Sequence, residues 1–383
     1  MATATKGMTS VKELYENRSQ RAKELISEGK KIVGYLCCYP PVELVTAAGM
    51  VPYRLTGSLQ PITEADSVIE TLVCPYVRSL FDLGIKGQYR FVDGIIWPHT
   101  CDSIYKSIDI WKYYMKPRLL HFLDVPHQLY PTSFEFFEFQ IALLKEYLED
   151  FAGTKISNQS LNDAIKLHNQ NRSLLRELCA LRKADPPLIS GTEMTQVMVA
   201  VMTIPVEEAN ELVKSVIAEV KGRRERPQKK PCRLLVYGSV IDDIAFIKVV
   251  EESGANVVID DLCFGTRYYW HDVEITADPL RSLAERYLDK IMCPRTHRPD
   301  LETREKTLAS RYGYLKEYAR EYNANGVILY VLRFCDAAAF DAPELSDYLQ
   351  KAGLPVLHLE DDYSLTSIQG FRTRVQAFLE MIG

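Results

Sequence analysis

The sequence contains none of the short motifs that mark the commonest self-contained enzyme chemistries. There is no GxGxxG dinucleotide motif, no phosphate-binding loop with its lysine, and no GxSxG motif. Such motifs supply either the backbone N–H groups that cradle phosphates or an exposed nucleophilic serine. Their absence argues against nucleotide hydrolysis by this chain itself and against serine-hydrolase chemistry.

Long apolar runs and strong charge of one sign are also missing. No apolar run approaches the length that a bilayer requires, and residues 1–20 lack the apolar core of a signal sequence. The net charge is −5, and the dense basic run at 221–231 is short and isolated. We therefore expect a cytoplasmic protein that binds neither nucleic acid nor membrane.

The composition is that of a folded globular protein, with 47% hydrophobic and 25% charged residues among 383. This length predicts two domains. Apolar runs bounded by turn-forming residues alternate with helical patterns at both ends of the chain, which is typical of βαβ units and parallel sheets. The predicted strands are 30–38, 50–55, 91–98, 118–126, 232–239, 255–261, 325–334 and 354–361.

Helical periodicity replaces the strand pattern in the middle of the chain. We predict an α/β fold of two parallel-sheet, Rossmann-like domains with a helical block between them. The predicted parts are an N-terminal α/β domain (1–132), the helical block packed on it (133–220), a basic linker (221–231) and a C-terminal α/β domain (232–383). Residues 12–28 are predicted to be helical.

Cysteine is the most informative residue type in this sequence. The nine cysteines are an odd number scattered through a large chain, so a disulfide framework is not expected. Four sites lie just after predicted strands: Cys37 with Cys38, then Cys101, Cys263 and Cys335. Ligands of open parallel sheets bind at the carboxyl ends of the strands, so these thiols are predicted to line a shared cleft.

The remaining cysteines divide into two groups. Cys74 and Cys293 each precede a proline, which holds the backbone locally extended, and both are added to the predicted cleft. Cys179, within a predicted helix, and Cys232, at the start of a strand, are read as packed small hydrophobes, as most single cysteines are. No CxxC spacing is present, and such wide separations fit an iron–sulfur cluster held by several loops better than a zinc knuckle.

Two other residues are candidates for acid–base or binding roles. Glu43, in the first turn of the helix after the first strand, could be a catalytic acid or base beside Cys37. A carboxylate at that position would equally complement the helix dipole. His99, two residues before Cys101, could bond a substrate carbonyl or a cluster sulfide, or be a structural histidine. Both pairs of alternatives stay open.

A series of segments over nearly the whole chain resembles the 2-hydroxyacyl-CoA dehydratase and benzoyl-CoA reductase superfamily. The segments appear in order and are specific to the superfamily, though less so to one member. They are VGYLCCYPPVELVTAAGMVPYRLTG, VCPYVRS, FVDGIIWPHTCDS, VVIDDLCFGTRYYW, VLRFCDAAAFDAPELSDYL, GLPVLHLEDDY and RTRVQAFLEMI.

The resemblance implies an oxygen-sensitive iron–sulfur protein whose subunits pair and whose α/β domains hold a cluster between them. A separate ATP-hydrolysing activator would deliver single electrons at low potential, which explains the missing nucleotide loop. The implied ligands of a [4Fe–4S] cluster are Cys74, Cys101 and Cys335. Electron transfer onto the carbonyl of a CoA thioester would then drive dehydration or ring reduction.

Cys37, Cys263 and Cys293 are additional to the ordinary subunits of that superfamily. With them the chain resembles the double-cubane branch, in which six cysteines hold an [8Fe–9S] cluster. That branch implies a homodimer that reduces small molecules, whereas the other implies a dissimilar partner subunit and a CoA thioester substrate. The choice of Cys37 over Cys38 rests on its position in the motif.

The leading interpretation is therefore a catalytic iron–sulfur component. A function of a different class also stays open, namely a non-catalytic cluster-carrying partner or an electron-storage subunit. A zinc-bound structural protein is the remaining alternative.

Overall fold

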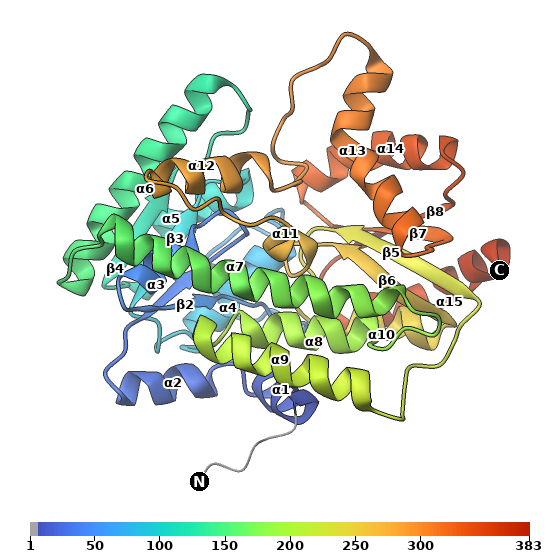
Figure 1. The fold of residues 1–383 in the computed structure, drawn as a ribbon, viewed down its shortest axis with the longest axis horizontal. Helices are drawn as coiled ribbons and strands as arrows, with labels where there is room; N and C mark the ends of the chain where they lie inside the picture. The colour runs from blue at the N-terminus through green and yellow to red at the C-terminus, as the bar shows by residue number, and fades with distance from the viewer. Residues whose placement is uncertain (1–6) are drawn as a thin grey trace.

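The computed structural model describes residues 7–383 and contains two four-stranded parallel sheets (Figure 1). The first consists of β1 (Ile32–Tyr35), β2 (Val51–Arg54), β3 (Gly94–Pro98) and β4 (Leu119–Leu123), in the order β2-β1-β3-β4. The second consists of β5 (Cys232–Gly238), β6 (Ala255–Asp261), β7 (Gly326–Leu332) and β8 (Val356–Asp361), in the order β6-β5-β7-β8. All these strands lie within predicted ranges, and the predicted α/β fold is confirmed.

In each sheet, three of the four strands are buried at every residue. Every residue of β1, β3, β5 and β7 is buried, as expected for parallel strands that helices cover on both faces. The outer strands β4 and β8 include more exposed positions. Tyr35, at the end of β1, is in register with Arg54 of β2 and Ile96 of β3. The carboxyl ends of these strands therefore meet at one edge of the sheet.

Helices fill the chain between the two sheets: α6 (Pro131–Ala152), α7 (Asn158–Ala180), α8 (Gly191–Val201) and α9 (Val206–Gly222). The α6 helix ends at Gly153, whose φ of 74° glycine adopts without strain. The Ser157 hydroxyl accepts a hydrogen bond from the Ser160 N–H and starts α7. The α7 helix packs on α3 (Val42–Ala47) and on α11 (Thr266–Tyr269), so it bridges the two sheets (Figure 1). The domain limits stay predictions.

The helical stretch predicted over 12–28 is helical apart from a turn that divides it and its last residue. The chain forms α1 (Gly7–Glu16) and α2 (Gln20–Ser27), separated by a turn. The α1 helix packs against α8 and α9, and a Cβ on Gly7 would lie 2.7 Å from the Val216 backbone nitrogen. This close approach fixes where the first helix lies, and the local sequence pattern does not show it.

The two halves, here residues 7–132 and 232–383, contact each other directly. The Gly57 N–H donates to Asp242 Oδ2 at 2.7 Å, and the Tyr39 and Thr296 hydroxyls lie 2.8 Å apart. Helix α12 of the second half packs on α6. The other helices are η1 (Ala65–Ser67), α4 (Pro75–Ile85), α5 (Asp102–Met115), η2 (Leu181–Lys183), α10 (Ala245–Glu252), α12 (Pro279–Asp289), α13 (Arg304–Glu321), α14 (Asp336–Lys351) and α15 (Leu365–Ile382).

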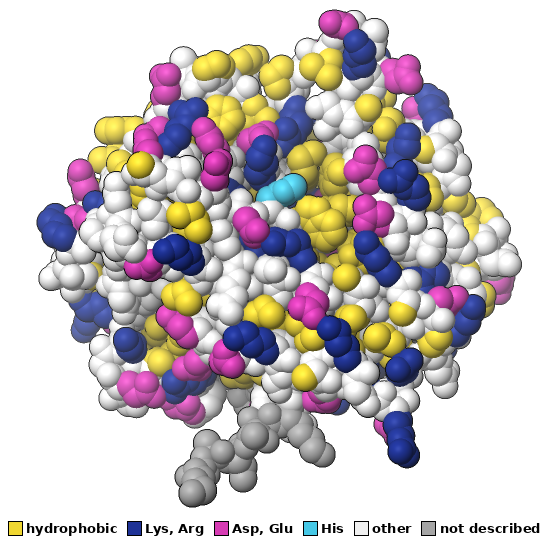
Figure 2. Space-filling model, viewed as in Figure 1, with side chains coloured by type: hydrophobic (Ala, Val, Ile, Leu, Met, Phe, Trp, Pro, Cys, Tyr) yellow, Lys and Arg dark blue, Asp and Glu magenta, His cyan; other side chains and the backbone are white. Residues whose placement is uncertain are grey.

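Surface charge is mixed on the face viewed in Figure 2, where basic and acidic side chains are interspersed and no large area of one sign is visible. Within residues 7–383, no helix combines the length and the apolarity that crossing a membrane demands.

Candidate functional site

Thiols from both halves come together at the carboxyl ends of the two sheets. Burial raises the pKa of Cys101, and negative charge on Cys37, Cys74 or Cys335 would raise it further. Burial also raises the pKa of Cys293 to about 12; Arg267 opposes this rise and Cys263 adds to it. Such mutual effects require short separations. The structure thus brings the six predicted ligands into one region, here called the thiol region, while ligation itself stays a prediction.

Three of these cysteines sit at helix N-termini. Cys74, Cys101 and Cys335 immediately precede the first residues of α4, α5 and α14. Burial raises the pKa of each thiol, whereas backbone N–H groups of the following helical turn donate to the sulfur and lower it. The positive ends of the helix dipoles also favour anionic sulfur. These three positions are suited to thiolates that share a large negative charge.

The thiol region lies at the switch point of each sheet. Cys37 follows β1 and Cys101 follows β3, on the two sides of the point where the strand order of the first sheet reverses. Cys335 follows β7 at the corresponding point of the second sheet. Switch points form the crevice in which open parallel sheets bind ligands. The backbone is left-handed at Cys37 (φ 57°) and at Phe334 (φ 59°), and such strain is common at ligand sites.

The proline after Cys74 begins a helix. Pro75 is the first residue of α4, where its missing N–H would have no helical partner in any case, so proline starts a helix there. Cys293 lies in the irregular segment between α12 and α13, and its carbonyl accepts a hydrogen bond from the Thr296 N–H at 3.0 Å. Both thiols nevertheless belong to the thiol region.

Cys38 is a thiol of this region that was not chosen as a ligand from the sequence. A hydrogen bond from Cys38 lowers the pKa of Cys263. The neighbouring Cys37 Sγ lies 3.1 Å from Thr100 Oγ1. Both members of the CysCys pair therefore approach the other thiols, and the choice of Cys37 as ligand stays a prediction.

Two buried arginines supply positive charge to the thiol region. Arg267 pairs with Asp261, Nη2 to Oδ2 at 2.8 Å, and its Nη1 lies 3.9 Å from Cys263 Sγ. Burial and Cys263 raise the pKa of Cys37 to about 11, and Arg54 opposes that rise. The hydrogen bond from Cys38 lowers the pKa of Cys263 most, and burial opposes it. The guanidinium groups of Arg267 and Arg54 lower the pKa of Cys263 further. Cys263 thus ionises more readily than an ordinary cysteine.

Cys179 and Cys232 make the contacts of packed thiols. Cys179 Sγ lies 3.2 Å from the Tyr322 hydroxyl and 3.1 Å from Arg182 Nη2. Cys232 Sγ donates to the Leu379 carbonyl at 3.7 Å. Both side chains are buried, and neither contacts the thiol region. They therefore serve as internal controls for any test of ligation.

His99 forms a histidine–carboxylate pair at the edge of the thiol region. Its Nδ1 lies 2.8 Å from Asp124 Oδ1, and its ring packs beside Tyr105, whose backbone N–H bonds the Cys101 carbonyl. A carboxylate on Nδ1 orients the imidazole and supports proton transfer at the other ring nitrogen. The pair could hold or move a proton near the thiols, and the role predicted for His99 stays a prediction.

Glu43 belongs to a buried ion pair. Its carboxylate pairs with Arg172 of α7 and accepts a hydrogen bond from the Tyr287 hydroxyl of α12 at 2.8 Å. Burial opposes ionisation, but Arg172 and His168 lower the pKa of Glu43 to about 2. These contacts tie α3, α7 and α12 together. The catalytic role of Glu43 stays a prediction, and its surroundings favour a structural one.

Glu43→Gln separates the two roles. We expect the variant to lose about 3–5 kcal/mol of unfolding free energy, because the Arg172 charge would stay buried without its counter-charge. Since the folded pKa of Glu43 is about 2, this contribution is complete at neutral pH and fades only as the pH falls toward 2. Denaturant unfolding at pH 7 measures the loss. Wild-type stability combined with lost turnover would instead indicate catalysis.

The chemistry of the thiols decides which group the region could bind. Among residues 7–383, no three His, Cys, Asp or Glu side chains converge closely enough to bind a single ion. The six cysteines share one region, and thiolates are the soft ligands that iron–sulfur clusters use. The residues therefore fit a sulfide-bridged iron group, with helix N-termini and arginines offsetting its negative charge.

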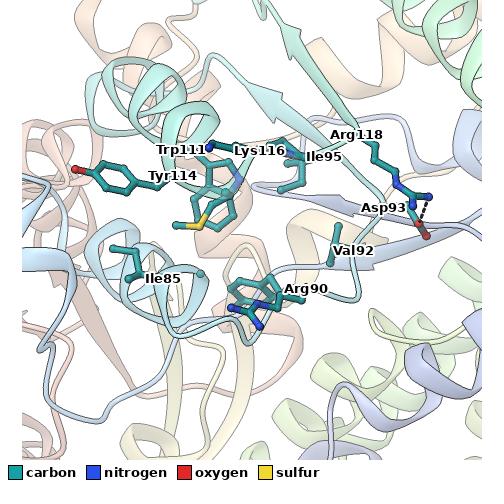
Figure 3. Close-up of a pocket in the computed structure, with 13 residues that line it drawn as sticks. Ile85, Arg90, Val92, Asp93, Ile95, Trp111, Tyr114, Lys116 and Arg118 are labelled. Carbon is teal, nitrogen blue, oxygen red and sulfur yellow. Dashed lines mark ion pairs between the residues drawn. The ribbon is translucent and has the colours of Figure 1, made fainter.

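A separate cavity of about 420 Å³ opens at the opposite edge of the first sheet (Figure 3). It lies near the amino ends of β3 and β4 and is lined by Trp111 and by the basic side chains of Arg90, Lys116 and Arg118. Arg118 Nη1 lies 3.8 Å from Asp93 Oδ1. None of the predicted site residues lines this cavity, so it is distinct from the thiol region.

Residues of the thiol region that the sequence analysis missed are Asp124, Thr100, Arg54 and Arg267. Asp124 directly follows β4, so the rule that located the cysteines would also have found it. The arginines carry no such signal, because a lone arginine in a strand or short helix is usually a surface residue.

Comparisons with known proteins agree over nearly the whole chain. The family model described as 2-hydroxyglutaryl-CoA dehydratase, D-component, matches residues 37–382. One of the benzoyl-CoA reductase subunits of Thauera aromatica is 27% identical over 358 residues, 92% of this chain and 91% of that protein. The (R)-phenyllactyl-CoA dehydratase beta subunit of Clostridium sporogenes is 26% identical over 384 residues, 100% of both chains. The beta subunit of (R)-2-hydroxyglutaryl-CoA dehydratase from Acidaminococcus fermentans is 24% identical, with 93% of each chain covered.

Proposed function

Because this chain belongs to the 2-hydroxyglutaryl-CoA dehydratase D-component family, we propose that it is an iron–sulfur catalytic component that dehydrates or reduces a CoA thioester. The superfamily resemblance drawn from the sequence is confirmed by this match, and the similar proteins named above are dehydratase and reductase subunits. The finer assignment of cluster, electron donor and substrate is the proposal.

The observation that carries the proposal is the meeting of Cys74, Cys101 and Cys335 at the N-termini of three helices. These are the three ligands that the resemblance implies. Together they would hold a [4Fe–4S] cluster and leave one iron free of a protein ligand. When bound, the cluster would supply low-potential single electrons for radical chemistry on a thioester carbonyl.

The chain's own polar groups would then bind and handle protons. His99, oriented by Asp124 and two residues before Cys101, is placed to hold a proton at its second ring nitrogen. The positive charges of Arg54 and Arg267 would stabilise the added negative charge of a reduced cluster in the thiol region. Because the sequence lacks a phosphate-binding loop, the electrons would come from a separate ATP-hydrolysing activator. A second subunit of the same family is the proposed partner.

A second candidate is a homodimeric double-cubane reductase of small molecules. It is favoured by the approach of Cys37, Cys263 and Cys293 to the other three thiols. Each half then contributes three of six cysteines: Cys37, Cys74 and Cys101 from the first, and Cys263, Cys293 and Cys335 from the second. An [8Fe–9S] cluster requires six such ligands.

The test is an anaerobic assay with a family activator, ATP and a reductant. We expect consumption of a 2-hydroxyacyl-CoA or of benzoyl-CoA when the partner subunit is added. Turnover of small molecules by the homodimer, without CoA thioester consumption, would favour the second candidate. A cluster that takes up electrons while no substrate is consumed would contradict catalysis and indicate an electron-storage subunit.

A further inference from the structure

Arg54 is a buried arginine whose charge has no partner in the part of the chain that the structure describes. It is the last residue of β2, and 1% of its surface is exposed. The atoms Nε, Nη1 and Nη2 are all buried and none makes a hydrogen bond within residues 7–383. A buried ionised group normally has a counter-charge or hydrogen-bond acceptors. Arg54 therefore lacks something that the folded protein should supply.

The other buried arginines show what is normal in this molecule. Arg172, Arg182 and Arg267 pair with the carboxylates of Glu43, Asp260 and Asp261. Arg233, Arg286 and Arg295 donate to backbone carbonyls. The absence of partners is thus particular to Arg54 among the described buried arginines.

The position of Arg54 indicates where its partner would be. The guanidinium carbon lies 5.4 Å from the centre of the Tyr35 ring of β1 and 4.6 Å from the centre of the Phe264 ring, which directly follows Cys263. The group therefore bridges the two halves at the thiol region. Its charge acts on Cys37 of the first half and on Cys263 of the second. Aromatic faces attract a cation weakly and cannot replace an anion.

We propose that the Arg54 guanidinium compensates the negative charge of the iron–sulfur group that the thiol region holds. This inference rests on the proposed function and assigns a role to a residue that lies outside the cysteine set. A fixed positive charge stabilises the reduced form of a neighbouring cluster more than the oxidised form, because the reduced form carries one more electron. Arg54 should therefore raise the midpoint potential.

The test compares Arg54→Met with wild type in two states, iron-free and loaded. Methionine keeps much of the apolar volume and removes the charge. In the iron-free protein we expect an equal or higher melting temperature, since an uncompensated buried charge disappears. In the loaded protein we expect a more negative midpoint potential in an EPR-monitored redox titration, and a smaller rise in melting temperature on loading. Arg54→Lys, which keeps the charge, should stay close to wild type in potential.

Arg182→Met is the matched control. Arg182 is equally buried, but it pairs with Asp260 Oδ2 at 2.9 Å and lies outside the thiol region. Its loss should lower the melting temperature of both states alike and leave the potential unchanged. The same pattern in Arg54→Met, or an Arg54→Met chain that does not fold without iron, would overturn the inference. Wild-type protein that binds no iron would refute the proposed function, and the inference with it. If Arg54→Met binds iron and its midpoint potential equals that of wild type, the inference alone is refuted.

Discussion

Cys101→Ala is expected to lose most of the iron that the wild-type chain binds, together with all activator-dependent turnover. Cys101 follows β3 at the switch point of the first sheet and precedes α5, and its thiol is close to Cys37, Cys74 and Cys335. Removing one of three thiolates leaves a cubane without an anchor. Iron and acid-labile sulfide, measured on protein purified without oxygen, report the loss.

Cys335→Ala should behave in the same way, because Cys335 occupies the corresponding position after β7 and before α14. The control is Cys179→Ala, which removes a buried thiol that contacts Tyr322 and Arg182 instead. That variant should keep its full iron content even if packing changes reduce its stability. Full iron retention in Cys101→Ala or Cys335→Ala would rule out the ligand assignment.

Cys263→Ala is expected to distinguish the two kinds of cluster. If six cysteines hold a double cubane, loss of this thiol should remove about half of the iron, because one cubane loses a ligand while the other keeps its three. If Cys74, Cys101 and Cys335 hold a single cubane, iron content should change little. Iron per chain and the EPR spectrum of the reduced protein measure the difference.

The iron content of Cys263→Ala also depends on Cys38, whose thiol forms a hydrogen bond with Cys263. Cys38→Ala is therefore the companion variant, and we expect it to keep its iron because Cys37 is the predicted ligand. If Cys38→Ala loses iron and Cys37→Ala does not, the choice between the adjacent cysteines is reversed. Loss of most of the iron in Cys263→Ala would contradict both cluster readings.

The sequence predicted the strands well because each is a short apolar run between turn-forming residues. It also located the thiol region, since the carboxyl ends of parallel strands meet at one edge and most of the cysteines follow strands. It did not show that Pro75 starts a helix, because a proline after a cysteine can start a helix as well as end a strand. It did not show where the first helical stretch begins and is divided, because packing on α8 and α9 determines where α1 lies.

Long-range partners were beyond the reach of sequence patterns. The Glu43–Arg172 pair joins residues 129 positions apart, so a carboxylate in a first helical turn gave no sign that it would be buried and paired. Arg54 is the last residue of an apolar strand and looks like an ordinary strand end. Its burial without a partner emerges only when the second half brings Phe264 against it.

The shared strand order of the two sheets gives the cysteine pattern a physical meaning. Cys101 and Cys335 follow equivalent strands and precede equivalent helices. Each half thus presents a thiol at its own switch point, and the contact between the halves brings the two points together. A group bound there would hold both halves in place, so loading should raise the stability of the whole chain.

Iron and acid-labile sulfide per chain, determined on anaerobically purified protein, test the central claim most directly. About four of each, or about eight irons with about nine sulfides, would place an iron–sulfur group on this chain and would also distinguish the single from the double cubane. Zinc without sulfide, or protein that stays free of metal after reconstitution with iron and sulfide, would contradict the claim.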